Sequence, residues 1–570
     1  MPSERASVKK RSRRDCLPSQ EPDFKLPNEV LAEIFIFLRL MFPYIPCDFY
    51  QWSSILLVNR QWHDTAISCP FLWTELEISR NIPDCYLERS CTQPLSLRWI
   101  KSHSQDVSLG RYSAYLPRAR QLYLLGMAQD NEVQAFNGID AFPLLEDLTL
   151  YPSSLDPLPI SFVCGHFPRL TSLTLCITWP IKWWYTIFSP NLQHLFIDGT
   201  LQILPMTATE LLNGLRLIPL LESLQLLNIV PGLEEVADLT SESIIAFPTL
   251  KHLSLGGSVK QCTALLKCLT FPSAANIDIR CEVSVDDNGN PLIPEGALPE
   301  LSKVLRDKIV PRDDSESLFS PMKYLLVQQY EHLDPISGDA SGTARLRCMR
   351  DDKPFGDSTL KNLLFFEEVR CERYQIIREV FQNDLQGVQV LLSWDLTKNT
   401  PFERLPSWPA DICQSLPLEE VTTVTLDLDW STSLMGIGKM CPNVTTVLGR
   451  DEQETEGISS LYYLLDMDED RCRQNYLHFP KMKTLVIDRV DFGDPSRVWW
   501  ELELLREDIQ DLPTEDKAML ERIYLAAEDP GAGDPIVQDY HTRLNELKDE
   551  APHVDIAMVD YTKSLEWLRV

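Results

Sequence analysis

The sequence predicts an α/β fold: a helical amino-terminal element, then a solenoid with a curved parallel sheet, then a helical carboxy-terminal cap. Three observations lead to this prediction. The chain has 570 residues, which is too long for one compact core. A segment of about 25 residues recurs along most of it. An unusually apolar helical segment precedes the repeats.

The repeats share the pattern P-x-L-x-x-L-x-L, and the best copies follow one another at intervals of 22 to 29 residues. The last three positions alternate apolar, polar and apolar, which is typical of a half-buried strand. One unit cannot bury its apolar edge alone, so the units are expected to stack into a parallel sheet. Good copies begin at Pro117, Pro143, Pro168, Pro190, Pro219 and Pro248, and weaker copies at Pro272, Pro321, Pro417, Pro442 and Pro480.

The polar positions of these strands are expected to face outward and to form a recognition surface. Their side chains are mixed in type from unit to unit, as those of a protein-recognition surface would be. The residues predicted to line this surface are Arg120, Tyr123, Glu146, Thr149, Thr174, His194, Phe196, Gln225, His252 and Ser254.

Residues 26–38 predict one helix, with Pro27 suited to its first turn and Glu29 favourable at its amino-terminal end. Its apolar residues form two rows at helical spacing, whereas a helix lying on a core needs only one stripe. A second helix is predicted over 53–68, capped by a serine hydroxyl at Ser53 or Ser54. The surrounding segment is short, so we expect a partner protein to cover the surplus apolar row.

We predict four regions. Residues 1–22 form a basic, disordered tail whose Lys9–Arg14 cluster is either a nuclear-import address or a solvated segment. Residues 23–78 form the helical element, and 79–495 the repeats, with an irregular insertion at about 283–410. Residues 496–570 form an acidic helical cap. The start of the chain is polar, so we expect no secretory signal, reduced cysteines, and a location in the cytoplasm, the nucleus or both.

Residues 26–78 resemble the F-box family, and the segments that carry the resemblance are LP at 26–27, IF at 34–35, LVNRQW at 57–62 and PFLW at 70–73. The repeats resemble leucine-rich repeats. The combination, including YLERSCTQPLSL at 86–97, is similar to the F-box/leucine-rich-repeat proteins abundant in fungi. Two features depart from the family: Asn59 stands where cysteine is usual, and the segment between the two helices, 39–52, is long.

The resemblance implies a subunit that joins a substrate to a cullin-RING ubiquitin ligase through a Skp-type adaptor, while the repeats bind the substrate. A repeat scaffold without any link to a ligase is the alternative. The residues that the resemblance implies for adaptor binding are Leu26, Pro27, Val30, Ile34, Phe35, Leu38, Leu57, Val58, Asn59, Arg60 and Trp62.

Composition and motifs argue against other classes of function. The net charge of −30 disfavours nucleic-acid binding, and no apolar run is long enough to predict a membrane span. Asp427 and Asp429 are read as a solvated strand face rather than a catalytic pair. The loops beginning at Asp286 and Asp466 depart from calcium-loop spacing, and His194 and His252 lie too far apart to share a metal directly. We therefore expect a non-enzymatic protein without a cofactor or a metal.

Overall fold

A computed structural model gives the fold as a mixed α/β protein with one large, mostly parallel sheet. The description that follows is confined to the residues that the structure describes. These are residues 26–41, 51–78, 84–100, 109–127, 136, 142–152, 167–176, 187–199, 208–228, 244–285, 291–310, 321–333, 340–350, 387–396, 408–427, 434–450, 479, 481–488, 520–527, 545, 548–549, 552 and 554–560.

The first run of the sheet is entirely parallel, and its strands pair in chain order. The two-stranded pair of β8 (Ile245–Ala246) and β10 (Leu269–Thr270) lies outside this run. The strands of the run are β1 (Glu75–Glu77), β2 (Leu95–Ile100), β3 (Ala119–Met127), β4 (Asp147–Pro152), β5 (Ser172–Cys176), β6 (His194–Asp198), β7 (Ser223–Leu227), β9 (His252–Gly257) and β11 (Asn276–Glu282).

The strand register confirms the repeat alignment. One row across β3 to β9 consists of leucines that are almost completely buried, and they form the core under the sheet. The alternate positions point to the opposite face, as the two-residue period of a strand requires. The leucine row is Leu122, Leu148, Leu173, Leu195, Leu224 and Leu253.

A β-turn explains why proline opens each repeat. In the second unit the amide of Leu145 donates to the carbonyl oxygen of Phe142 at 3.2 Å, which places Pro143 at the second position of the turn. Proline suits that position because its ring fixes the required backbone angle. The same hydrogen bond joins Leu170 to Phe167 and Leu250 to Phe247. In these repeats the pattern P-x-L therefore fixes the entry into the strand.

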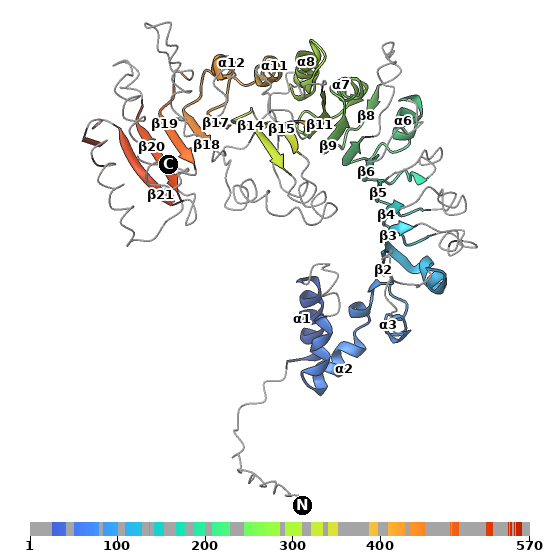
Figure 1. Cartoon of the computed structure of the whole chain (residues 1–570). Coiled ribbons are helices and arrows are strands. Elements are labelled where there is room, and N and C mark those ends of the chain that lie inside the picture. Colours follow the sequence, from blue (N-terminus) through green and yellow to red (C-terminus); the bar gives the residue numbers. More distant parts are fainter. Residues whose placement is uncertain are drawn as a thin grey trace, which may run out of the picture.

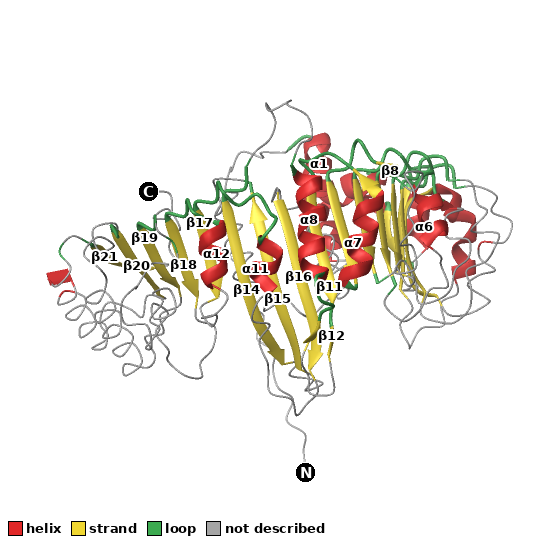
Figure 2. Cartoon of the chain, turned by 90° about the horizontal axis from the view of Figure 1, so that it is seen from above, coloured by secondary structure: helices red, strands yellow, loops and turns green. Residues whose placement is uncertain are grey.

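Short helices line the outer side of the curved sheet (Figures 1 and 2). The inner side of the curve carries the outward strand positions of the repeats. Among these helices α7 has a capping box, in which Ser258 and Gln261 exchange hydrogen bonds between side chain and backbone. The helices are α6 (Ala208–Leu215), α7 (Val259–Cys268), α8 (Ala297–Ile309), α11 (Trp408–Cys413) and α12 (Leu434–Met440).

At the amino terminus the first helix matches the prediction closely, and the second is shorter than predicted. The helix predicted over 53–68 is wrong in its first half. Residues 51–57 form a 3₁₀ turn, and Asn59, not Ser53 or Ser54, is the N-cap of the α-helix. The elements here are α1 (Asn28–Met41), η1 (Gln51–Leu57), α2 (Arg60–Ser68), η2 (Pro70–Trp73), α3 (Asp84–Arg89) and η3 (Leu109–Arg118).

The middle of the chain contributes three long strands to the sheet. β16 (Gly387–Leu396) pairs in parallel with β11, while β15 (Ala340–Met349) runs antiparallel between β16 and β14 (Tyr324–Leu333). Near residue 285 a short antiparallel pair joins β12 (Ser284–Val285) and β13 (Pro291–Leu292). Part of the predicted irregular insertion, 283–410, is therefore regular sheet.

A second parallel run begins at β14, and it corrects the prediction of a helical cap over 496–570. Strands occupy 522–527 and 555–560, where the sequence was read as acidic helices. Leu520, Ile523 and Leu525 keep the L-x-x-L-x-L spacing, but Ala518 stands two residues before Leu520, where the pattern P-x-L has proline, so the repeat pattern missed them. The strands are β17 (Thr423–Asp427), β18 (Thr446–Arg450), β19 (Thr484–Asp488), β20 (Arg522–Ala527) and β21 (Asp555–Asp560).

Candidate protein-interaction surfaces

One apolar stripe of α1 packs within the amino-terminal element. Leu31 and Phe35 are buried together with Trp52, Ala66 and Trp73. The ring of Phe35 also lies 5.1 Å, between centroids, from that of Trp62. The prediction that Phe35 contacts a partner is therefore wrong, because its side chain belongs to the core of this element.

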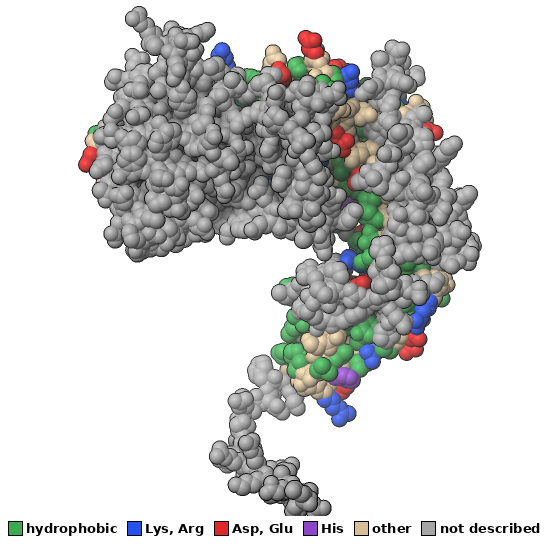
Figure 3. Space-filling model, in the orientation of Figure 1, with side chains coloured by type: hydrophobic (Ala, Val, Ile, Leu, Met, Phe, Trp, Pro, Cys, Tyr) green, Lys and Arg blue, Asp and Glu red, His purple; other side chains and the backbone are tan. Residues whose placement is uncertain are grey.

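The second stripe of α1 is exposed. Val30, Ile34 and Phe37 follow helical spacing, and Ile34 keeps 44% of its surface in solvent. Leu57 and Val58, just before α2, are also exposed, Leu57 at 88%. We call these five residues the amino-terminal apolar surface. Hydrophobic side chains gather over this end of the molecule in Figure 3.

This concentration of exposed apolar side chains sets the amino-terminal element apart. Single exposed apolar residues are ordinary, whereas a group of them marks a binding surface. The large apolar side chains found exposed among the described residues are ten, and six of these lie within residues 30–71. They are the five residues of the amino-terminal apolar surface and Phe71.

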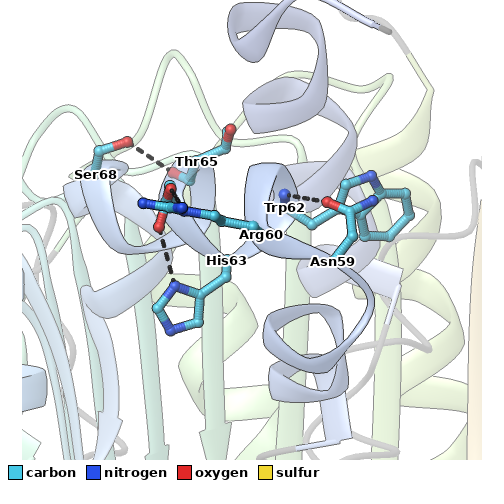
Figure 4. Close-up of polar contacts among 7 residues, drawn as sticks. Asn59, Arg60, Trp62, His63, Thr65 and Ser68 are labelled. Carbon is cyan, nitrogen blue, oxygen red and sulfur yellow. Dashed lines mark hydrogen bonds and ion pairs between the residues drawn. The ribbon is translucent and has the colours of Figure 1, made fainter. Parts of the chain in front are cut away.

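Polar contacts hold the beginnings of the two helices together. The Gln61 side chain amide donates to the carbonyl oxygen of Leu26 at 2.8 Å and to Asn28 Oδ1 at 3.0 Å. The Asn59 Oδ1 atom accepts the backbone amide of Trp62 at 2.9 Å and caps α2 (Figure 4). Exposed Leu57 and Val58 are thereby held beside the end of α1 that carries Val30.

The remaining residues that were predicted to bind the adaptor differ in how exposed their side chains are. Pro27, Asn59 and Arg60 are exposed, whereas Leu26, Leu38 and Trp62 are half-buried. Arg60 forms an ion pair with Asp64 at 3.6 Å, and His63 contacts the same carboxylate (Figure 4). Such an exposed pair contributes little to stability.

Aromatic and cationic contacts join the amino-terminal element to the sheet. The Arg39 guanidinium lies 4.9 Å from the Trp52 ring centroid and donates to the carbonyl oxygen of Glu75, in β1, at 2.9 Å. Trp73 packs edge-on against Trp52 and Tyr86, with centroids 5.3 and 4.7 Å away. Its indole N–H donates to the carbonyl oxygen of Ala66 at 3.0 Å. The exposed stripe of α1 is thus presented on a firmly attached element.

Most of the predicted recognition residues lie on the inner sheet face, which we define as the strand positions that alternate with the core leucines. His194 is exposed there, and Tyr123, Thr174 and His252 are half-buried. The assignment of Arg120 and Glu146 to this face is wrong, because each stands two residues before a core leucine, at the entry to its strand. The register places His194, Ser223 and His252 side by side, as the repeat alignment predicts.

Four predicted recognition residues are buried, which corrects their assignment as exposed contacts: Thr149, Phe196, Gln225 and Ser254. Side chains on neighbouring strands account for part of this burial. The Ser254 hydroxyl, for example, lies 3.3 Å from Asp278 Oδ2 on the next strand. Sequence periodicity indicates which face a residue occupies, but its exposure depends on the side chains of both adjacent strands.

Ion pairs cross between repeats at the entry to the strands. Arg120 pairs with Glu146 at 2.7 Å, and Lys251 pairs with Glu222 at 2.6 Å. On the inner sheet face the Tyr123 hydroxyl donates to Asp147 Oδ2 at 3.4 Å, and Arg98 lies over the Tyr123 ring. Arg120 and Glu146, both predicted recognition residues, are therefore paired with each other, and Tyr123 contacts Asp147 and Arg98.

An apolar cluster on the inner sheet face escaped the sequence analysis. Cys176, Phe196 and Leu227 are buried against one another, with Tyr151 packed beside them. We call these four residues the inner apolar cluster. Apart from Phe196, its members occupy the third outward position of each strand, one step beyond the positions considered in the repeat pattern.

Two buried polar side chains accompany the cluster. Asp198 lies between Cys176 and Leu227 in the strand register, and Gln225 lies beside Phe196. Asp198 Oδ1 and Gln225 Oε1 are buried without a hydrogen-bond partner among the described residues. Burial, reinforced by the charge of Glu282, raises the pKa of Asp198 to about 6. A buried acceptor without a donor is costly, so this arrangement calls for an explanation.

Other predicted features are only partly covered. In the described ranges, no group of three or more His, Cys, Asp or Glu side chains is arranged to hold a metal. The cysteines there are all free, and most are buried. None of the described helices combines the length and the apolar character needed to cross a membrane. The basic tail, the side chains of Asp427 and Asp429, and the loops from Asp286 and Asp466 lie outside the described residues.

Comparison of the sequence with protein-family models and with curated proteins found no match.

Proposed function

We propose that this protein is the substrate-recognition subunit of an SCF-type cullin-RING ubiquitin ligase. In this proposal residues 23–78 form an F-box-like domain that binds a Skp-type adaptor, and the sheet that follows is a leucine-rich-repeat solenoid that binds a protein substrate. The protein itself needs no catalytic group. Holding the substrate close to the ligase raises its effective concentration there.

The observation that carries the proposal is the exposed second stripe of α1. The helix already buries Leu31 and Phe35 within its own element, so Val30, Ile34 and Phe37 have no structural reason to be apolar. Burial of such side chains contributes roughly 25 cal/mol per Å² of apolar surface. A helical partner surface laid over α1 and the start of α2 would gain this energy.

The repeats support the second half of the proposal. Parallel strands in register present mixed polar side chains on one continuous inner face. A scaffold without a link to a ligase would share this face. It would give no role to the amino-terminal apolar surface in the turnover of a bound protein, so the two functions make different predictions.

The adaptor test compares two aspartate substitutions at apolar residues of similar exposure. Ile34→Asp places a charge in the amino-terminal apolar surface, whereas Leu217→Asp places one beside the sheet, where Leu217 is 52% exposed. With a purified Skp-type adaptor, we expect Ile34→Asp to weaken binding at least about tenfold, because a buried unpaired charge is costly. Leu217→Asp should bind like the unmodified chain.

Binding is measured by titration calorimetry, and circular dichroism checks that both variants remain folded. Absence of any adaptor complex at micromolar protein would refute the ligase assignment. Equal affinities for Ile34→Asp and Leu217→Asp would refute the assigned surface. If the adaptor binds but Ile34→Asp leaves the turnover of a bound protein unchanged in cells, the scaffold function is favoured.

A further inference from the structure

We propose that the inner apolar cluster, together with Asp198 and Gln225, binds a lysine or arginine side chain of a protein substrate next to an apolar residue. This inference rests on the proposed function, because it names the chemistry of the segment that the inner sheet face recognises. Its occupant is an extended basic and apolar peptide segment.

The first step of the argument is hydrogen-bonding capacity. Asp198 is only 8% exposed, and neither its Oδ1 atom nor Gln225 Oε1 has a donor among the described residues. The two residues lie on adjacent strands, one step apart diagonally, since Phe196 pairs with Gln225 and Asp198 with Leu227. An ammonium or guanidinium group supplies several donors at once. Both unpartnered acceptors therefore fit the same ligand group.

The second step is charge. The nearby cation, Arg280, already pairs with Asp278 at 2.8 Å and so does not neutralise Asp198 fully. Glu282 adds further negative potential, and the neighbouring thiol of Cys176 stays neutral because burial raises its pKa to about 12. The chain as a whole carries a net charge of −30. A cationic side chain is thus the complementary ligand.

The third step is the apolar surround. Tyr151, Cys176, Phe196 and Leu227 lie beside the two acceptors, and charge-assisted hydrogen bonds gain strength in such low-dielectric surroundings. Gly256 contributes space on the next strand: a Cβ atom there would lie 2.9 Å from Leu227 Cδ2. The Leu227 side chain therefore fills space that a side chain at position 256 would otherwise occupy. An apolar residue beside the substrate cation would pack against this cluster.

The test uses the full 570-residue chain and synthetic peptide mixtures with randomised flanking positions. The central residue is fixed as lysine, arginine, norleucine or glutamate. Fluorescence anisotropy measures affinity, and sequencing of the retained peptides identifies flanking preferences. We expect the lysine and arginine mixtures to bind at least about tenfold more tightly than the norleucine mixture, with apolar residues enriched beside the cation.

Asp198→Asn should abolish this preference, since it removes the charge while keeping the side-chain shape. Asp307→Asn, an exposed position on α8, removes the same charge elsewhere and controls for general attraction to an acidic chain. Equal loss in both variants, or no preference for a cation in the unmodified chain, would overturn the proposal. No adaptor is present in this assay, so its outcome is independent of whether the ligase assignment holds.

The preference should also depend on pH. Protonation of Asp198 removes the charge that attracts the ligand, and its titration is set by burial and by the charges of Glu282 and Arg280 on β11, while the facing thiol of Cys176 on β5 stays neutral. The lysine preference should therefore weaken as pH falls through about 6. A preference that is unchanged between pH 7 and pH 5 would contradict the role of Asp198.

Discussion

Asp198 shows how one side chain can lower stability while serving recognition. Its carboxylate is buried beside apolar groups, and its pKa lies at about 6 instead of the usual range near 4. Because the folded state binds this proton more tightly than the unfolded state, the stability that it contributes is present at low pH. That stability is lost as pH rises through the folded pKa.

Asp198→Asn should accordingly stabilise the free protein at pH 7, by at most about 3 kcal/mol, since the neutral amide avoids burying a charge. The gain should shrink as pH falls from about 6 to below about 4, where the carboxyl of the unmodified chain becomes protonated in both the folded and the unfolded state. Thermal unfolding at several pH values measures this difference. A variant that is less stable at pH 7 would show that the carboxylate has an internal partner.

For single residues, sequence periodicity predicted which face of the sheet a side chain occupies, but not how deeply that side chain is buried. The repeat alignment assigned His194, Ser223 and His252 to one row, and the register confirms it. It missed Asp198 because the pattern was read only as far as the last core leucine. Extending it by one outward position would have found an aspartate among apolar residues. Its burial follows from side chains on neighbouring strands, which a single segment does not reveal.

At the scale of elements, the start of α2 depends on one side chain. The Asn59 Oδ1 atom caps the helix by accepting the amide of Trp62. The sequence predicted a helix over this region but placed its start too early, because apolar spacing in residues 53–58 suits a 3₁₀ turn equally well. Capping chemistry, rather than periodicity, determines this boundary.

Asn59→Ala should destabilise the first turn of α2 by about 1 kcal/mol, since an alanine cannot accept the orphan amide. Hydrogen exchange at Trp62 and the adjacent amides should then be about fivefold faster. Asn59→Asp retains the acceptor and serves as the matched control, with exchange close to that of the unmodified chain. Equal acceleration in both variants would indicate that the cap does not stabilise this turn.

At the scale of the whole molecule, three strands connect two parallel runs. Strands β1 to β7, β9 and β11 form one run and β17 to β21 belong to the other, and β16, β15 and β14 lie between them, with β14 pairing in parallel with β17. The repeats predicted most of both runs because each unit carries its own turn and core leucines. They did not predict the connection, since β15 runs antiparallel and its pairing joins segments far apart in sequence.

Gly387 begins β16 and allows the backbones of β15 and β16 to approach closely. A Cβ atom there would collide with the backbone carbonyl oxygen of Cys348, and the Gly387 amide donates to Asn276 Oδ1 at 2.8 Å. Gly387→Ala should therefore push β15 and β16 apart at a cost of at least about 2 kcal/mol. In the described part of the sheet the two runs meet through these strands, and α8 also packs against α11 across the same junction, with the Ser302 hydroxyl bonded to the carbonyl oxygen of Ile412. Loss of the strand pairing should therefore weaken the coupling between the runs enough for them to unfold in two steps.

Calorimetry of Gly387→Ala should resolve two unfolding transitions, the first below that of the unmodified chain, and limited proteolysis should cleave first between the two runs. Gly296→Ala is the control. Its left-handed backbone, with φ of 74°, makes alanine unfavourable by about 1 kcal/mol, but no atom lies within 4 Å of the added methyl group. That variant should lower stability without dividing the transition. If Gly387→Ala unfolds like this control, the antiparallel strand does not couple the two runs.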